Sequence, residues 1–403
     1  MKKNKYINGI LPMLLINFSI GAVYCWTLFK EDVRSFTGFG KPAVEWCFSL
    51  ALFFLGMSAA FGGKLVEKDV KKASFITFFM VTLGWLVAGL GIQLKSAAIT
   101  IIGFGAIQGI GLGIGYITPV KTLMVWLEHS TGFAAGLSIT GFALTGLLLN
   151  PLISLLLRSL PVYGVFYLLA GIFGILSFTA FLLIYRPESR EKRLDLQKIL
   201  SVKEIIFSGK FLLLWLLFFI NIACGLALIS HEKQIYTILG YDSNATIIIF
   251  CNISVVFNLV GRMSMASLQD KLKSKHTPYF YMAILSLTVC LITSVFAKTL
   301  TVTLAMMWVV NFFFGCGFSC LPNILDQQYG LNQLATIQGL MLSAWAVAGL
   351  FGNQFASLII DRYDYRLAPL YVYLGIFFTI ELIVLLIWSN LRSVSEHKLD
   401  VIT

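Results

Sequence analysis

One charged side chain stands inside a stretch that is long and apolar enough to cross a membrane. Residues 257–275 read FNLVGRMSMASLQDKLKSK, and Arg262 precedes the charged end at Asp270 by about 12 Å of helix. A charge at that depth costs about 2.5–3.5 kcal/mol on insertion scales, so it must be paired, hydrated or used. A guanidinium in a water-accessible cavity binds carboxylate or phosphate through two parallel hydrogen bonds. Arg262 is therefore the first substrate-binding candidate; the alternative is a helix-packing cation satisfied by neighbouring carbonyl groups.

Five further residues are candidates for the same site: Asn258, Trp345, Tyr116, Tyr24 and Trp26. Asn258 precedes Arg262 by one helical turn on the same face, and it is neutral. Trp345 is expected at a similar depth in its own segment, where it would line the site or stack on the guanidinium. Packing against lipid or the helix core is the alternative for Trp345. Tyr24 and Trp26 also fit an aromatic belt at the membrane interface.

Two titratable residues in apolar segments need an explanation. His231, followed by Glu232 and Lys233, is predicted at the external end of the seventh segment. Its imidazole titrates in the physiological range, which makes it a proton-coupling candidate; an ordinary interfacial histidine is the alternative. Glu381 lies deep in the last segment and needs a partner, so we expect it to have a structural or lipid-shielded role.

Residue patterns typical of enzymes and metalloproteins are not found. The seven cysteines fall in apolar segments without paired spacing, which predicts neither a disulfide framework nor a metal site. No nucleophile has an accompanying base, and the glycines at 111–115 are followed by no Walker lysine. Those glycines are instead spaced for close helix packing. We expect no cofactor, no metal and no enzymatic activity.

Composition defines the elements that must position these residues. The chain has 403 residues, of which 58% are hydrophobic and 12% charged, and this is about half the charged fraction of soluble domains. It is predicted to be an all-α membrane protein with a first helix that is retained and not cleaved as a signal peptide. Twelve segments of spanning length are predicted at 7–29, 43–63, 73–94, 97–120, 132–157, 162–185, 209–231, 244–268, 278–297, 300–322, 336–360 and 367–390.

The basic residues are distributed unequally between the two sides. With the N-terminus inside, 20 lysines and arginines fall on cytoplasmic segments and 9 on the other side, which leaves Arg262 within the membrane. This asymmetry follows the positive-inside rule and predicts a multi-pass protein of the cytoplasmic (inner) membrane with both termini in the cytoplasm. The net charge of +11 is thus a topology signal and predicts no nucleic-acid partner.

The two halves of the chain repeat each other. GLSITGFALTGLLLN at 136–150 matches GLMLSAWAVAGLFGN at 339–353, and INFSIGAVYCWT at 16–27 matches INIACGLALISH at 220–231. A parallel duplication of six helices is typical of major facilitator carriers, whose substrate site is formed between the two halves. The sequence therefore predicts three parts: a six-helix bundle at 1–185, a cytoplasmic linker at 186–208 that is able to form an amphipathic surface helix, and a second six-helix bundle at 209–403.

The corresponding cytoplasmic loops of the repeat also match, GKLVEK at 63–68 with ASLQDK at 266–271. The resemblance of these loops to the cytoplasmic loops of major facilitator carriers implies that Glu67, Lys68, Asp270 and Lys271 act in gating.

Five segments spread over nearly the whole chain carry a family resemblance: GAVYCWTLF (21–29), GIGYITPVKTLMVW (113–126), GLALISH (225–231), NLVGR (258–262) and GLMLSAWAVAG (339–349). In these segments the chain resembles the oxalate/formate antiporter family of the major facilitator superfamily, a relative of the monocarboxylate transporters. The resemblance implies a rocker-switch carrier of small carboxylates in which Arg262 binds the carboxylate.

Some residues depart from that family. Oxalate exchangers pair the helix-eight arginine with a lysine in helix eleven, where this chain has Trp345; one fixed cation matches one carboxylate better than two. Glu67 stands where the superfamily usually has aspartate, and WLEHSTGF at 126–133 lacks the charges common in that loop. Lys121 is unexpected, and it would either add positive potential at the inner mouth or anchor a helix end.

These observations predict a secondary transporter of a small monocarboxylate such as formate, lactate or pyruvate, working by alternating access with proton symport or anion exchange. One alternative is an oxalate-type dicarboxylate/formate exchanger. Another is a membrane sensor that binds a carboxylate without moving it. The expected partners are the substrate and the lipid bilayer, and we expect a monomer.

Overall fold

The computed structural model describes residues 4, 6–187, 201–241, 243–272 and 274–400. The regular structure in this part of the chain is helical, which confirms the predicted all-α class. Twelve helical stretches in it are long and apolar enough to span a membrane: Tyr6–Cys25, Pro42–Lys68, Val70–Gln93, Ala97–Trp126, Thr131–Ser159, Val162–Leu183, Gly209–Ile238, Ile249–Asp270, Thr277–Val295, Leu300–Tyr329, Leu331–Arg362 and Leu367–Asn390.

The helices group into two compact units. The first comprises Met1–Lys198 and Leu325–Ala346, and the second comprises Ile199–Ile324 and Val347–Thr403. The greater part of the predicted linker, residues 188–200, lies outside the described residues, and so does most of its predicted amphipathic helix. Directly after it, Ser201 begins the short helix α10 (Val202–Ile206), because its hydroxyl accepts a hydrogen bond from the Glu204 backbone at 3.2 Å.

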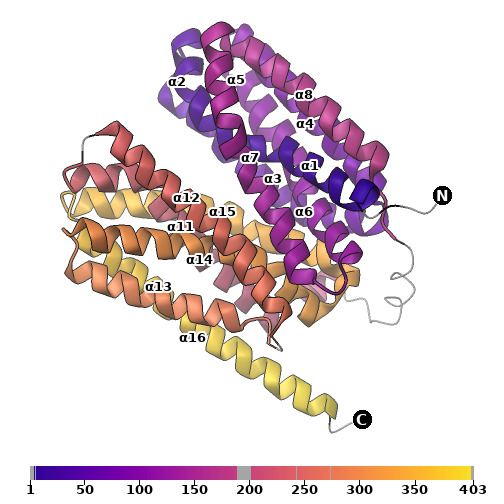
Figure 1. The fold of residues 1–403 in the computed structure, drawn as a ribbon, viewed down its shortest axis with the longest axis vertical. Helices are drawn as coiled ribbons and strands as arrows, with labels where there is room; N and C mark the ends of the chain where they lie inside the picture. The colour runs from indigo at the N-terminus through magenta and orange to yellow at the C-terminus, as the bar shows by residue number, and fades with distance from the viewer. Residues whose placement is uncertain (1–3, 5, 188–200, 242, 273, 401–403) are drawn as a thin grey trace. The chain divides into compact units, whose positions relative to one another are not determined.

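The first unit contains these elements: η1 (Tyr6–Ile10), α1 (Leu11–Gly21), η2 (Ala22–Cys25), α2 (Trp26–Thr37), α3 (Lys41–Lys68), α4 (Val70–Gln93), α5 (Ala97–Thr100), η3 (Ile101–Ile107), α6 (Gln108–Trp126), α7 (Thr131–Ser159), α8 (Val162–Leu183), η4 (Leu331–Gln333) and the first turns of α15 (Leu334–Arg362). Helices α3 and α6 run side by side (Figure 1). Gly113 makes this possible, because a Cβ there would overlap the Leu55 carbonyl and the Ser58 hydroxyl of α3.

The second unit contains α10, α11 (Gly209–Ile238), α12 (Asn244–Asp270), α13 (Thr277–Val295), most of α14 (Leu300–Tyr329), the second part of α15, and α16 (Leu367–Asp400). Helices α13 and α16 pack along each other (Figure 1), and α11 also packs on α16. Gly315 of α14 lies against the Asn258 backbone of α12, so these two helices approach closely as well. This contact brings the α12 residues of the candidate site next to α14.

A short turn joins α3 to α4. Asp69 has an extended backbone and ends α3, and its carboxylate accepts a hydrogen bond from the Lys72 backbone at 2.9 Å. Aspartate is a favoured N-cap because it satisfies an otherwise unpaired amide of the first helical turn. The cap fixes the end of α3, where the gating candidate Glu67 is placed.

Candidate substrate site

Helix α12 carries a row of buried polar side chains on one face. Ser254, Asn258 and Arg262 follow at intervals of four residues, and all three are buried, whereas Val256 and Val260 between them are exposed. Residues at i and i+4 lie above one another on a helix. Asn258 and Arg262 were predicted to share this face, and the burial pattern adds Ser254.

Arg262 is held in place by its own helix and by α14. Only 3% of its surface is exposed, Nε donates to Asn258 Oδ1 at 2.9 Å, and Cζ lies 5.0 Å from the ring centroid of Phe318. Asn258 in turn donates from Nδ2 to the Asn311 carbonyl oxygen at 3.2 Å. A guanidinium fixed at Nε and against an aromatic face presents its terminal nitrogens in a defined orientation, as bidentate recognition of a carboxylate requires.

The first unit assembles an aromatic cluster from four rings. Tyr24, Tyr116 and Trp345 all pack around Phe142 of α7, with ring centroids 5.3, 5.2 and 6.4 Å from it. Tyr116 and Trp345 also contact each other at 5.8 Å. Three of the substrate-binding candidates are thus brought together within one unit. Phe142, which the repeat aligns with Trp345, links them and was not among the candidates.

Trp26 occupies a different environment from these three residues. It is fully buried, and its Nε1 donates to the Val44 carbonyl oxygen at 3.1 Å. Its ring packs on Phe104 and Phe166, with centroids 4.2 and 6.3 Å away. This placement is that of a core residue of the first bundle, because the indole is enclosed by aromatic rings and its N–H is satisfied by the backbone.

His231 is half-buried, and its Nδ1 lies 3.1 Å from the Ala227 carbonyl oxygen of the same helix. The following residue, Glu232, is the more deeply buried of the two and contacts the polar row of α12. Its Oε1 accepts hydrogen bonds from Ser254 at 2.5 Å and from Tyr236 at 2.9 Å. The helical period could have found this pair, since Glu232 and Tyr236 are four residues apart.

The gating candidates have unequal surroundings. The carboxylate of Glu67 accepts hydrogen bonds from Lys121 of α6 at 2.5 Å and from the Ala335 backbone at 2.6 Å, at the beginning of α15. The Lys121 ammonium also donates to the Leu331 carbonyl oxygen. Lys68, by contrast, is exposed. Glu67 therefore joins three helices of the first unit, and the unexpected Lys121 is its partner.

The second-half gating candidates lie at the end of α12, where Asp270 is half-buried and Lys271 exposed. The buried polar residue beside them is Gln269 of α12, whose amide nitrogen donates to the Cys320 carbonyl oxygen at 3.2 Å and to the Lys275 carbonyl oxygen. A neutral amide thus joins α12 to α14 at this end of the second unit.

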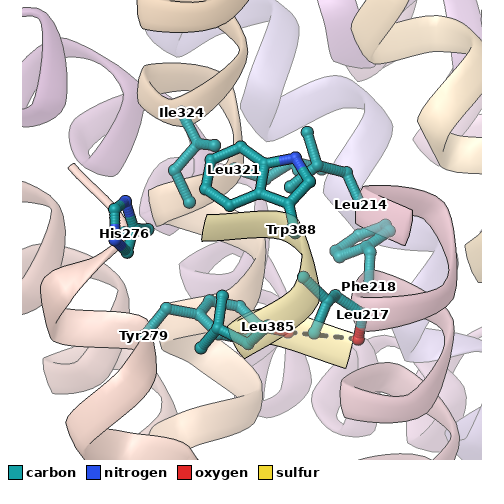
Figure 2. Close-up of a pocket in the computed structure, with 9 residues that line it drawn as sticks. All are labelled: Leu214, Leu217, Phe218, His276, Tyr279, Leu321, Ile324, Leu385 and Trp388. Carbon is teal, nitrogen blue, oxygen red and sulfur yellow. Dashed lines mark hydrogen bonds between the residues drawn. The ribbon is translucent and has the colours of Figure 1, made fainter. Parts of the chain in front are cut away.

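Glu381 is fully buried, and Tyr279 of α13 donates to its Oε1 at 2.8 Å. The same hydroxyl also lies within hydrogen-bond distance of the Leu217 carbonyl oxygen, at 3.2 Å, and Figure 2 shows the latter contact at the edge of a largely apolar pocket. The pocket is lined by Leu214, Leu217, Phe218, His276, Tyr279, Leu321, Ile324, Leu385 and Trp388 (Figure 2). None of the substrate-binding candidates lines it.

The family assignment follows from a family model. The Major Facilitator Superfamily model matches residues 5–353, so the chain belongs to this superfamily of transporters. A solved bacterial homologue of the iron transporter ferroportin, in an outward-facing state, superposes with a TM-score of 0.71 at 14% identity, over 94% of this chain and 98% of that one. This likeness concerns the fold alone.

Two sequence relatives cover most of the chain. The oxalate:formate antiporter of Oxalobacter formigenes is 24% identical over 369 residues, which are 91% of this chain and 87% of the relative. An uncharacterised major facilitator transporter of Escherichia coli (strain K12) is 22% identical over 354 residues, 85% of each chain. The first relative agrees with the resemblance identified from the sequence motifs.

Proposed function

We propose that this transporter carries a small monocarboxylate, such as formate, lactate or pyruvate, across the cytoplasmic membrane by alternating access. The observation that carries the proposal is the buried Arg262 guanidinium, oriented by Asn258 and Phe318 on α12 and α14. A buried arginine in a membrane helix is expensive and is retained for function. Similarity to an oxalate:formate antiporter supports a carboxylate as the substrate.

The proposal assigns the remaining candidates by their chemistry. Asn258 fixes the guanidinium, and Tyr116, Tyr24 and Trp345 contribute apolar surface and polar ring edges for the organic part of the substrate. Glu67 acts in gating through its contacts with Lys121 and with the beginning of α15. The carrier works as a monomer of two six-helix bundles, at 1–185 and 209–403, with both termini in the cytoplasm.

The decisive experiment is uptake of radiolabelled monocarboxylates into proteoliposomes. Arg262→Ala is expected to reduce uptake at least tenfold, because the substrate loses a charge-assisted bidentate contact. Arg262→Lys is expected to recover only part of it, since an ammonium lacks the planar fork. Arg158→Ala is the matched control, because Arg158 is exposed at the end of α7. Normal uptake by Arg262→Ala at an equal amount of reconstituted protein would remove Arg262 from the mechanism.

Exchange of oxalate for formate is the second candidate function, favoured by the name of the Oxalobacter relative. The two candidates differ in the charge of the substrate. A monocarboxylate carrier is expected to be inhibited by unlabelled formate or pyruvate more strongly than by oxalate at equal concentration. The reverse order of inhibition would favour the dicarboxylate exchanger.

A further inference from the structure

Four charged side chains are buried among the described residues: Lys121, Glu232, Arg262 and Glu381. Lys121 pairs with Glu67, and Glu381 is hydrogen-bonded to Tyr279 in the interior of the second unit. Arg262 is the proposed anion-binding residue. Glu232 alone among the four has a titratable carboxylate that contacts the polar row of α12, and the proposed function so far gives it no role.

Glu232 of α11 is hydrogen-bonded to one hydroxyl of its own helix and to one hydroxyl of α12. Its exposed fraction is 6%, and Oε1 accepts both the Tyr236 hydroxyl at 2.9 Å and the Ser254 hydroxyl at 2.5 Å. Tyr236 itself packs in an apolar cluster with Ile247 and Leu304. The carboxylate therefore lies at the edge of an apolar cluster, where water is scarce.

The charges around Glu232 do not neutralise it. On its own helix, Lys233 is exposed and the half-buried His231 faces a backbone carbonyl. From α12 the nearby titratable side chain is Cys251, and from the turn after α11 it is Tyr241; the α14 members of the cluster, Leu300, Leu304 and Trp308, have none. On α16 the buried acid is Glu381, which belongs to the Tyr279 contact. In the part of the chain that the structure describes, no lysine, arginine or histidine nitrogen lies within 4.0 Å of the Glu232 carboxylate.

A buried carboxyl group without a neighbouring cation exists in one of two protonation states. It takes up a proton and becomes neutral, or it stays ionised at a cost in free energy that two hydroxyl donors offset only in part. Because Oε1 accepts both hydroxyl bonds in either form, Oε2 is the atom that gains and loses the proton. Oε1 therefore keeps both hydroxyl donors in either protonation state, as suits a reversible proton site.

The site is joined to the proposed anion-binding residue along one helix face. Ser254 contacts Glu232, and Asn258, one turn further, contacts Arg262. Ser254 and Arg262 are eight residues apart, which is about 12 Å of helix rise. Ser254 and Arg262 therefore move together with α12. A movement of this helix that turns Arg262 from one side of the membrane to the other also displaces Ser254, which contacts the Glu232 carboxyl group.

We infer that Glu232 is the proton-binding site that couples carboxylate transport to the proton gradient, with the Ser254, Asn258 and Arg262 row of α12 as the mechanical link. This inference rests on the proposed function of Arg262. A proton from the solution on one side adds to Oε2 of Glu232 while one monocarboxylate anion binds Arg262. Both leave on the other side, so each cycle moves one proton and one negative charge, and no net charge crosses the membrane.

The test compares two assays on the same proteoliposomes. Counterflow, with labelled carboxylate outside, unlabelled carboxylate inside and equal pH, measures movement of the loaded carrier. Uptake into vesicles without internal carboxylate, driven by an acid exterior and followed with an internal pH-sensitive dye, measures coupling. Glu232→Gln mimics the protonated acid and is expected to keep counterflow within about threefold of the unmodified carrier, whereas acid-driven uptake and the dye signal fall at least tenfold. Glu31→Gln, at an exposed glutamate of α2, is the matched control and keeps both.

Two results of these assays would overturn the inference. One is acid-driven uptake by Glu232→Gln at the level of the unmodified carrier. The other is an unmodified carrier that performs counterflow but shows no response to the pH gradient. If Glu232→Gln loses both activities, the pH profiles of the variants Ser254→Ala and Tyr236→Phe test the inference instead. Each removes one donor to the ionised carboxylate, so half-maximal acid-driven uptake moves to higher pH, and an unchanged profile in both variants rejects the site.

A spectroscopic measurement separates failure of the coupling site from failure of the proposed function. The infrared pH-difference spectrum of the reconstituted protein is expected to contain a protonated-carboxyl band that is missing in Glu232→Gln and present in Glu31→Gln. A carrier that moves carboxylates and lacks this band has another coupling mechanism. A protein that shows the band but moves no carboxylate keeps the proton site and refutes the carboxylate proposal.

Discussion

Trp26 and Trp345 are both buried, but their indole rings have different neighbours. Trp26 is satisfied by the Val44 carbonyl oxygen and enclosed by phenylalanine rings, whereas Trp345 meets Tyr116 and Phe142 edge to face or tilted. Both were substrate-binding candidates in the sequence, Trp345 for its depth and Trp26 as a residue near the membrane interface. The fold decides the neighbours of each ring. It places Trp26 in the core of the first unit and Trp345 beside Tyr116.

Substitution by phenylalanine is expected to have different effects at the two tryptophans. Trp26→Phe loses the bond to Val44 and leaves a cavity, so its thermal midpoint in detergent is expected to fall by several degrees, for a loss of about 1–3 kcal/mol. The KM of the surviving carrier should stay within twofold. Trp345→Phe is expected to raise KM several-fold with a smaller fall in the midpoint. A raised KM in Trp26→Phe together with an unchanged KM in Trp345→Phe would assign the substrate contact to Trp26 and the core role to Trp345.

At the scale of elements, helix ends carry the interhelical chemistry of the first unit. Glu67 at the end of α3 accepts a backbone amide at the beginning of α15 and an ammonium from α6. The unpaired amides of a helix N-terminus and its positive dipole end both favour a carboxylate there. The resemblance of this loop to the superfamily's cytoplasmic loop implied a gate, but it could not reveal the pairing of Glu67 with Lys121, because the two residues lie on different helices.

The Glu67 and Lys121 pair predicts strong coupling in a double-mutant cycle. Glu67→Gln leaves the buried Lys121 ammonium without its carboxylate partner, which costs about 3–5 kcal/mol, and Lys121→Met leaves the half-buried Glu67 carboxylate without its cation, which costs less. Each single variant is therefore expected to lower the thermal midpoint clearly, and the double variant should regain more than half of the loss. Additive losses in the double variant would show that the two side chains do not interact in the folded protein.

At the scale of the whole molecule, a duplicated chain carries an asymmetric chemistry. The repeat offset places Ala59 of α3 at the position of Arg262 in α12. Ala59 is fully buried, and a Cβ at Gly339 of α15 would overlap its carbonyl oxygen, so the helices there are too close for a long side chain. The duplication therefore gives the two halves equivalent helices. Close backbone packing around Ala59 leaves no room for a long cationic side chain in the first half, so the arginine is found only at the equivalent position of the second half.

The proposed topology predicts which loops face the outside of the cell. Lys298→Cys, in the loop between α13 and α14, is expected to react with a membrane-impermeant maleimide in intact cells. Lys203→Cys, in α10, should react only after permeabilisation, because its segment is predicted to be cytoplasmic. The native protein is a suitable background, since six of its seven cysteines are buried and Cys251 is half-buried. Labelling of Lys203→Cys in intact cells would reverse the orientation.

Hydropathy and the cost of an intramembrane charge are properties of a single segment, so the amino-acid sequence was enough to predict the twelve helices and the place of Arg262, and comparison of its segments predicted the duplication. The hydrogen-bond partners of the charged side chains, by contrast, became known from the folded structure. Glu232 meets Ser254 across 22 positions, Lys121 meets Glu67 across 54, and the Ala335 amide meets Glu67 across 268. Such pairs depend on which helix faces turn toward each other, and this is set by packing of the whole bundle, where small residues such as Gly113 and Gly315 allow close approach.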